Sequence, residues 1–130
     1  MMRESDLQAC LNSPHLWFDD AAANLVNKDL ESAQKYLGSV KEQKDAVNQI
    51  VVSYQVMYQA TQALLHSIRY KASGFRAVVT VLEDYFVKKG LLERVHLDHL
   101  LRGQSLVGTP EENLEAAEAY LTAVKKALGK

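Results

Sequence analysis

Apolar side chains recur every third or fourth residue along most of the chain, which is the spacing of one face of an α-helix. No segment shows the sustained alternation of apolar and polar residues that is typical of a half-buried strand. The longest periodic run, from about residue 41 to residue 70, carries an apolar face wider than one helix pair requires. We therefore expect this helix either to be central in a bundle or to line a subunit interface as well.

The other periodic segments predict further helices and little else. Pro14 disfavours helical backbone at the residue before it, so a short opening helix is expected to end there. The next residues are expected to form an apolar turn that packs Trp17, the only tryptophan, against the bundle. The expected helices span residues 3–11, 19–38, 41–70, 75–89, 91–102 and 109–128. Without the short opening helix, this pattern predicts an all-α fold, a four- to five-helix up-and-down bundle.

The chain is expected to be one domain over residues 1–130, with a short N-terminal helix and turn at 1–18 and the bundle at 19–128. Gly103 and Gly108 are expected to bracket a loop between the last two helices. Thr109, followed by Pro110 and by Glu112, gives the clearest helix start in the chain, because these are an N-cap residue, an N1 proline and the acid of a capping box.

Length and composition narrow the protein class. A chain of 130 residues with 48% hydrophobic residues is typical of one ordinary folded domain. The single cysteine, Cys10, cannot form an internal disulfide, and this favours a reducing, cytoplasmic location. Cys10 itself is expected to be a small buried hydrophobe. No stretch of about 18 uncharged apolar residues is present, so we expect no membrane anchor.

The charge is balanced overall but uneven along the chain. A net charge of −1 argues against a basic nucleic-acid-binding protein. The stretch 69–102 nevertheless holds seven basic and four acidic side chains. We regard Arg69, Lys71 and Arg76 as candidate contacts for RNA, a nucleotide or an acidic partner.

Motifs for familiar chemistry are missing. The sequence contains no phosphate-binding glycine loop, zinc-type cysteine pair or nucleophile elbow. Glu93, His96 and His99 are spaced by three residues, but each step of three rotates about 60° around a helix, so the outer two diverge. We therefore predict no metal site and no cofactor.

A resemblance to a known family suggests a function, which the apolar periodicity alone does not. Residues 53–65 read Ser-Tyr-Gln-Val-Met-Tyr-Gln-Ala-Thr-Gln-Ala-Leu-Leu. This string resembles the Tyr-Tyr-x-Met-Phe/Tyr-x-Ala-x-x-Ala-Leu-Leu signature of small prokaryotic HEPN (higher eukaryotes and prokaryotes nucleotide-binding) proteins. Residues 30–37 and 71–79 resemble the neighbouring family segments, and the resemblance covers roughly residues 22–128.

The resemblance implies a helical bundle that forms a homodimer, often encoded with a small nucleotidyltransferase as a toxin–antitoxin pair. Tyr54, Met57 and Tyr58, on the broad apolar face of the long helix, are the candidate interface residues of such a dimer. Active family members are metal-independent ribonucleases with an Arg-x(4–6)-His motif. In that motif His transfers a proton and Arg stabilises the charge that develops on the phosphate.

The chain departs from this motif. The family arginine falls on Arg102, but the segment that follows contains no histidine, and Phe75 stands where the family has a further histidine. The literal spacing occurs at Arg94 and His99, which an unbroken helix would place about 140° apart. We therefore take Arg102, Arg94 and His99 as candidate catalytic residues and expect a degenerate module that dimerises and binds a partner, nucleotide or RNA. The alternatives are an active ribonuclease toxin and a helical adaptor unrelated to HEPN.

Overall fold

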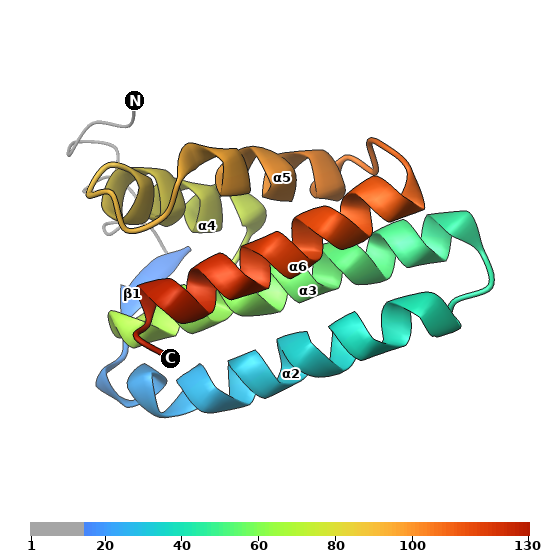
Figure 1. The fold of residues 1–130 in the computed structure, drawn as a ribbon. Helices are drawn as coiled ribbons and strands as arrows, with labels where there is room; N and C mark the ends of the chain where they lie inside the picture. Colours follow the sequence, from blue (N-terminus) through green and yellow to red (C-terminus); the bar gives the residue numbers. More distant parts are fainter. Residues whose placement is uncertain (1–14) are drawn as a thin grey trace.

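The apolar periodicity of the sequence corresponds to a helical bundle in the computed structural model, which describes residues 15–130 (Figure 1). The long helices run alternately up and down, and a small two-stranded sheet closes one end of the bundle. In chain order the elements are β1 (Leu16–Phe18), the 3-10 helix η1 (Asp20–Leu25), α2 (Val26–Ser39), the 3-10 helix η2 (Val40–Glu42), α3 (Ala46–Ser67), β2 (Tyr70–Ala72), α4 (Phe75–Val81), the π-helix η3 (Leu82–Val87), α5 (Arg94–Gln104) and α6 (Pro110–Ala127). The prediction of a mostly helical bundle is confirmed.

α3 is the central helix of the bundle. It packs chiefly against α2 and α6, and it also contacts α5. Met57, Ala60 and Leu64 have no exposed surface. The wide apolar face predicted for this helix is therefore used within the chain. Among residues 15–130, no helix is both long enough and apolar enough to cross a membrane.

α3 is shorter than the predicted helix at both ends. Asp45 caps its start, because the Asp45 carboxylate accepts a hydrogen bond of 2.9 Å from the backbone N–H of Val47. The residues just before this cap form the separate turn η2. After Ser67, Arg69 adopts a left-handed backbone conformation with φ of 67°, which turns the chain into β2. Periodicity alone did not resolve these two breaks.

The two-stranded sheet corrects the prediction for the segment around Trp17. β1 pairs antiparallel with β2, with Trp17 opposite Lys71. Leu16 is buried, but 44% of Trp17 is exposed, so Trp17 does not pack into the bundle. Strands of three residues are too short to produce a detectable alternation, which is why the sequence did not reveal them. The helix expected over residues 3–11 lies outside the described residues.

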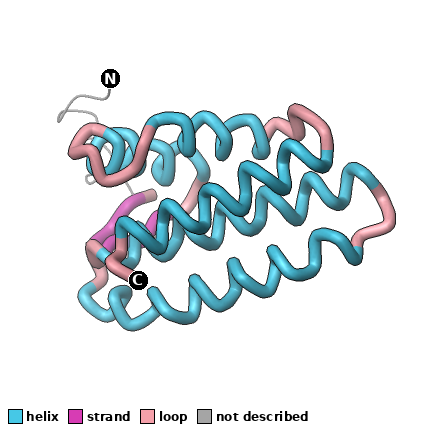
Figure 2. The backbone as a smooth tube through the Cα atoms, viewed as in Figure 1, coloured by secondary structure: helices cyan, strands magenta, loops and turns pink. Residues whose placement is uncertain are grey.

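The connection between α5 and α6 differs from the predicted loop (Figure 2). Gly103 belongs to α5 and is buried against α3, where a Cβ atom would lie 2.8 Å from the Met57 Cε. Gly103 therefore allows close packing of two helices and does not begin a loop. The predicted start of α6 is confirmed, since the N–H of Glu112 donates to the Thr109 Oγ1 at 3.1 Å.

Candidate functional site

α5 and α6 form the walls of an open groove of about 360 Å³. His99 and Arg102 are three residues apart on α5, so they lie on one side of that helix. Opposite them, α6 contributes a stripe with helical spacing. The other lining residues are Val107, Glu112, Asn113, Glu115, Ala116 and Ala119. The groove thus brings together two of the three candidate catalytic residues, His99 and Arg102.

Arg102 carries an unpaired charge within this groove. Its guanidinium makes no hydrogen bond or ion pair with any residue of the described chain. The carboxylates of Glu112 and Glu115 on the opposite wall are also unpaired within residues 15–130. No ion pair therefore closes the groove, and these charged groups are available to a ligand.

One ring nitrogen of His99 is buried. This nitrogen, Nδ1, has no hydrogen-bond partner within the described residues. Nε2 is consequently the nitrogen that can meet a ligand in the groove. The tautomer with its proton on Nε2 avoids a buried N–H without an acceptor. A neutral His99 would then donate a hydrogen bond into the groove.

A second histidine lies behind His99. The His96 ring is edge-to-face with the His99 ring at a centroid distance of 6.2 Å, and with the Tyr120 ring at 6.1 Å. Burial lowers the pKa of His96, and the nearby His99 lowers that pKa further. Because of this shift, we expect His96 to be neutral at pH 7. From the sequence, His96 was considered only as a metal ligand, and that site was rejected. The contact between the His96 and His99 rings was not predicted.

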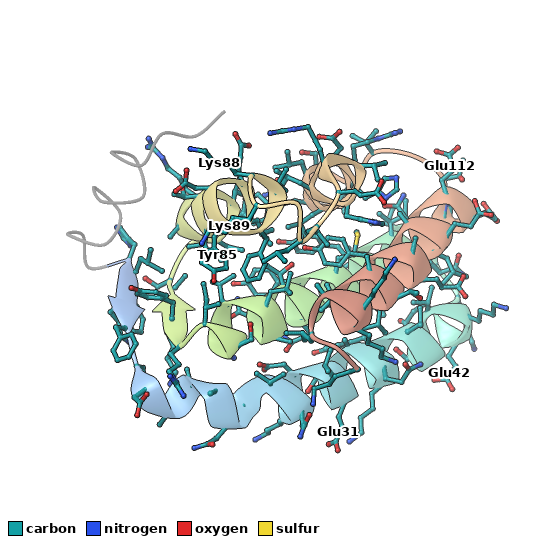
Figure 3. The ribbon with its side chains drawn as sticks, turned by 60° about the vertical axis from the view of Figure 1, so that its left-hand side comes forward. Glu31, Glu42, Tyr85, Lys88, Lys89 and Glu112 are labelled. Carbon is teal, nitrogen blue, oxygen red and sulfur yellow. The ribbon has the colours of Figure 1, made fainter. Side chains whose placement is uncertain are left out.

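Asn113 fixes the shape of the groove where α5 turns into α6. Only 5% of this residue is exposed, and its Nδ2 donates to the carbonyl oxygens of Val107 and Thr109, each at 2.9 Å. The connection also contains Leu106 and Gly108 in left-handed backbone conformations, with φ of 57° and 97°. Figure 3 labels Glu112 next to this connection, at the start of α6.

Arg94, the remaining candidate catalytic residue, points elsewhere. α5 is a continuous helix from Arg94 to Gln104, and Arg94 does not line the groove. Its guanidinium Nη1 lies 3.5 Å from the Glu83 Oε2. Arg94 and His99 are therefore not brought together within one chain, as their spacing on a regular helix implies.

The three candidate contacts Arg69, Lys71 and Arg76 also lie away from the groove. Arg69 directly precedes β2 and Lys71 belongs to it. This strand lies at the end of the bundle opposite the α5–α6 connection (Figure 1). Arg69 pairs with Asp20 at 3.1 Å and Lys71 with Asp19 at 3.2 Å. The hydrogen bond from Lys71 lowers the pKa of Asp19.

Other basic residues of the stretch 69–102 have partners as well. Lys88 lies 3.8 Å from the carboxylate of Asp84, and Lys89 lies over the Tyr85 ring, 4.1 Å from its centroid. Lys88, Lys89 and Tyr85 are labelled in Figure 3. Arg76 is exposed at the start of α4. Much of the predicted positive excess is thus offset locally. Arg76 and Arg102 have no ion-pair partner among the described residues, and of these two only Arg102 lines the groove.

The candidate interface residues of α3 lie mainly inside the chain. Met57 has no exposed surface. Tyr54 and Tyr58 are partly buried with ring centroids 6.0 Å apart, and burial raises the pKa of Tyr54 to about 12. Exposed apolar side chains occur on and around α5 instead, at both of its ends: Leu91, Val95, Leu101, Leu106 and Val107.

Three polar residues of the groove, Glu112, Asn113 and Glu115, were not predicted from the sequence as site residues. Glu112 and Glu115 have the spacing of acids that favour the positive end of a helix, so their position on a groove wall gave no separate signal. Asn113 follows a capping box and has no motif of its own. Among residues 15–130, no group of three or more His, Cys, Asp or Glu side chains is arranged to hold a metal ion.

Comparison of the chain with family models, with curated proteins and with solved structures finds no match in any of the three. The relation to HEPN proteins therefore rests on the sequence resemblance alone.

Proposed function

We propose that this chain is a HEPN-like helical module whose α5–α6 groove binds a phosphate group of RNA or of a nucleotide. The observation that carries the proposal is the unpaired guanidinium of Arg102 beside His99 in a groove of about 360 Å³. A volume of this size falls within the range of small-ligand sites. Arginine suits phosphate because its planar N–H groups form paired hydrogen bonds with two oxygens.

His99 adds a second contact to the proposed site. Because Nδ1 is buried, Nε2 is the ring nitrogen through which His99 would contact a ligand in the groove. A donor from His99 and the fork of Arg102 together would hold a phosphate between two groups on one helix. The mode of binding is then a charge-assisted contact and does not need a metal ion.

Binding of a labelled single-stranded RNA and of GMP tests this proposal. We expect Arg102→Gln to weaken binding about ten- to hundredfold, since one hydrogen-bonded charge contributes about 1.5–3 kcal/mol. Arg94→Gln removes the same charge from the same helix outside the groove, and its affinity is expected to stay near that of the wild type. Equal losses in both variants would indicate general charge attraction. No binding of either probe would favour the unrelated helical adaptor.

The second candidate function is metal-independent cleavage of RNA. The pair His99 and Arg102 favours it, because a proton-transferring group and a cation next to one phosphate are the components this reaction uses. Purified protein in EDTA is expected to cut labelled RNA, and His99→Ala and Arg102→Ala to lose cutting. Intact RNA after incubation with the wild type, together with measurable binding, would support the degenerate binding module.

The proposed quaternary state is a homodimer, with a second copy covering exposed apolar side chains of α5. Its support is the family resemblance together with the exposed side chains of Val95 and Leu101 on that helix. Light scattering is expected to give twice 14.6 kDa for the wild type and the monomer mass for Val95→Glu. Val47→Glu, at an exposed position of α3, is the matched control. A monomeric wild type would leave a nucleotidyltransferase as the partner that the resemblance implies.

A further inference from the structure

The two walls of the groove differ in hydrogen-bonding character. The α5 wall carries Arg102, whose guanidinium only donates. The α6 wall carries the carboxylates of Glu112 and Glu115, which only accept when ionised. None of these three groups has a partner within the described chain. A ligand can therefore meet a donor on one wall and acceptors on the other.

Asn113 extends the accepting wall, although an amide can in principle both donate and accept. Both of its neighbours at 2.9 Å are carbonyl oxygens, of Val107 and Thr109, and carbonyl oxygens cannot donate. The NH₂ group must therefore face them, and its two hydrogens are both used. Only Oδ1 remains for a ligand, and the residue is too deeply buried to turn freely.

A ligand that fits both walls must have an anion at one end and N–H donors at the other. Nucleotides have this form. Among the four RNA bases only guanine carries two adjacent donors, N1–H and the 2-amino group, on its Watson–Crick edge. These two donors match the two oxygens of one carboxylate. Adenine, cytosine and uracil each place an acceptor beside a donor on that edge, and this acceptor would oppose the carboxylate.

We propose that the groove selects guanine nucleotides. Arg102 would donate hydrogen bonds to the phosphate, and the Glu115 carboxylate would accept hydrogen bonds from the base. This inference rests on the proposed phosphate-binding function of the groove. Glu115 is the better reader of the two acids because it lies one turn into α6, beside Ala116 and Ala119, whose small side chains leave room for a flat base. Glu112 lies next to the turn at Gly108.

Calorimetric titration of the full chain with GMP, AMP, CMP and UMP tests the selection. GMP is expected to bind about tenfold more tightly than the other three, because one pair of hydrogen bonds to a base edge distinguishes the matching base from the others. Glu115→Gln replaces one accepting oxygen with a donor, so it is expected to lower GMP affinity about tenfold and to remove the preference. Glu118→Gln makes the same change on the exposed part of α6 outside the groove and is expected to preserve it.

The outcomes separate this inference from the function it rests on. Equal affinity for all four nucleotides, weakened equally by Arg102→Gln, would overturn guanine selection and keep phosphate binding. A preference for GMP that survives Glu115→Gln would overturn the role of Glu115. Failure of every nucleotide and RNA to bind would overturn both proposals. Short RNAs with and without one guanine show whether the ligand is a free nucleotide or an RNA strand. Only a site that binds a strand would bind the guanine-containing RNA more tightly than GMP.

Discussion

The hydroxyl groups of Thr61 and Tyr120 lie 2.5 Å apart in the interior, where they join α3 to α6. Thr61 Oγ1 also lies 2.7 Å from the carbonyl oxygen of Met57, which can only accept. The Thr61 proton therefore goes to Met57, and the Tyr120 hydroxyl donates to Thr61. Burial raises the pKa of Tyr120, which keeps the phenol protonated.

This direction of donation predicts unequal effects of removing the two hydroxyls. Tyr120→Phe leaves Thr61 with its bond to Met57 and should cost about 0.5–1.5 kcal/mol. Thr61→Val leaves the fully buried Tyr120 hydroxyl without a partner and should cost about 1–3 kcal/mol. The double variant should cost less than the sum. Urea unfolding measures all three, and a cost of Tyr120→Phe equal to or above that of Thr61→Val would contradict the assigned direction.

Two glycines in helices are expected to respond to alanine with opposite signs. Gly103→Ala places a methyl group 2.8 Å from the Met57 Cε, the end of a flexible but fully buried side chain, so Met57 must repack and the fold should be destabilised by about 1 kcal/mol. Gly38→Ala meets nothing within 4 Å and should stabilise α2 by about 0.5–1 kcal/mol. Thermal unfolding of the two variants checks the pair. Equal melting temperatures would show that α5 does not need its close approach to α3.

His96 predicts a pH dependence of stability. Its folded-state pKa lies below the ordinary value of 6.5, because burial disfavours the charged ring. The stability that neutral His96 contributes is therefore present above pH 6.5 and is lost as pH falls through the lower, folded-state pKa. Urea unfolding at pH 7.5 and pH 5 should show a larger loss for the wild type than for His96→Gln. An equal loss in both would assign the pH dependence to other groups.

Asn113 provides a test of the amide orientation in the groove. Asn113→Asp keeps the shape but cannot donate when ionised, so a carboxylate would face the carbonyl oxygens of Val107 and Thr109. We expect a loss of about 1–3 kcal/mol at pH 7, larger than for Asn113→Ala, and a smaller difference at pH 3. Hydrogen exchange of the amides in residues 105–109 should speed up in both variants. A fully stable Asn113→Asp would contradict the orientation.

The sequence could predict the bundle because each long helix buries a stripe, and its period is a local property. It could predict the start of α6 because Thr109, Pro110 and Glu112 are a local signal. The strands β1 and β2 could not be predicted, since three residues carry no measurable period. Arg102 and His99 were found through a motif.

The accepting wall of the groove could not be predicted in the same way. Glu115 has the expected place of an acid near a helix start, and its role depends on which side of α6 meets α5. That side is set by tertiary contacts, including the approach of Gly103 to Met57 and the bonds of Asn113. Such contacts are distant in sequence or lack a motif, so only the structure reveals them.

Both walls of the groove come from neighbouring helices joined by the short segment 105–109. The buried residues Ala117, Tyr120 and Leu121 fix the rotation of α6 against α3, so an inserted or deleted residue in this segment would be absorbed by the turn and would move Val107 at the edge of the groove. A different linker length would therefore change the side chains that border Arg102 while keeping the buried contacts of α6 with α3. The α5–α6 hairpin can thus diversify ligand choice by changes in length as well as by substitution.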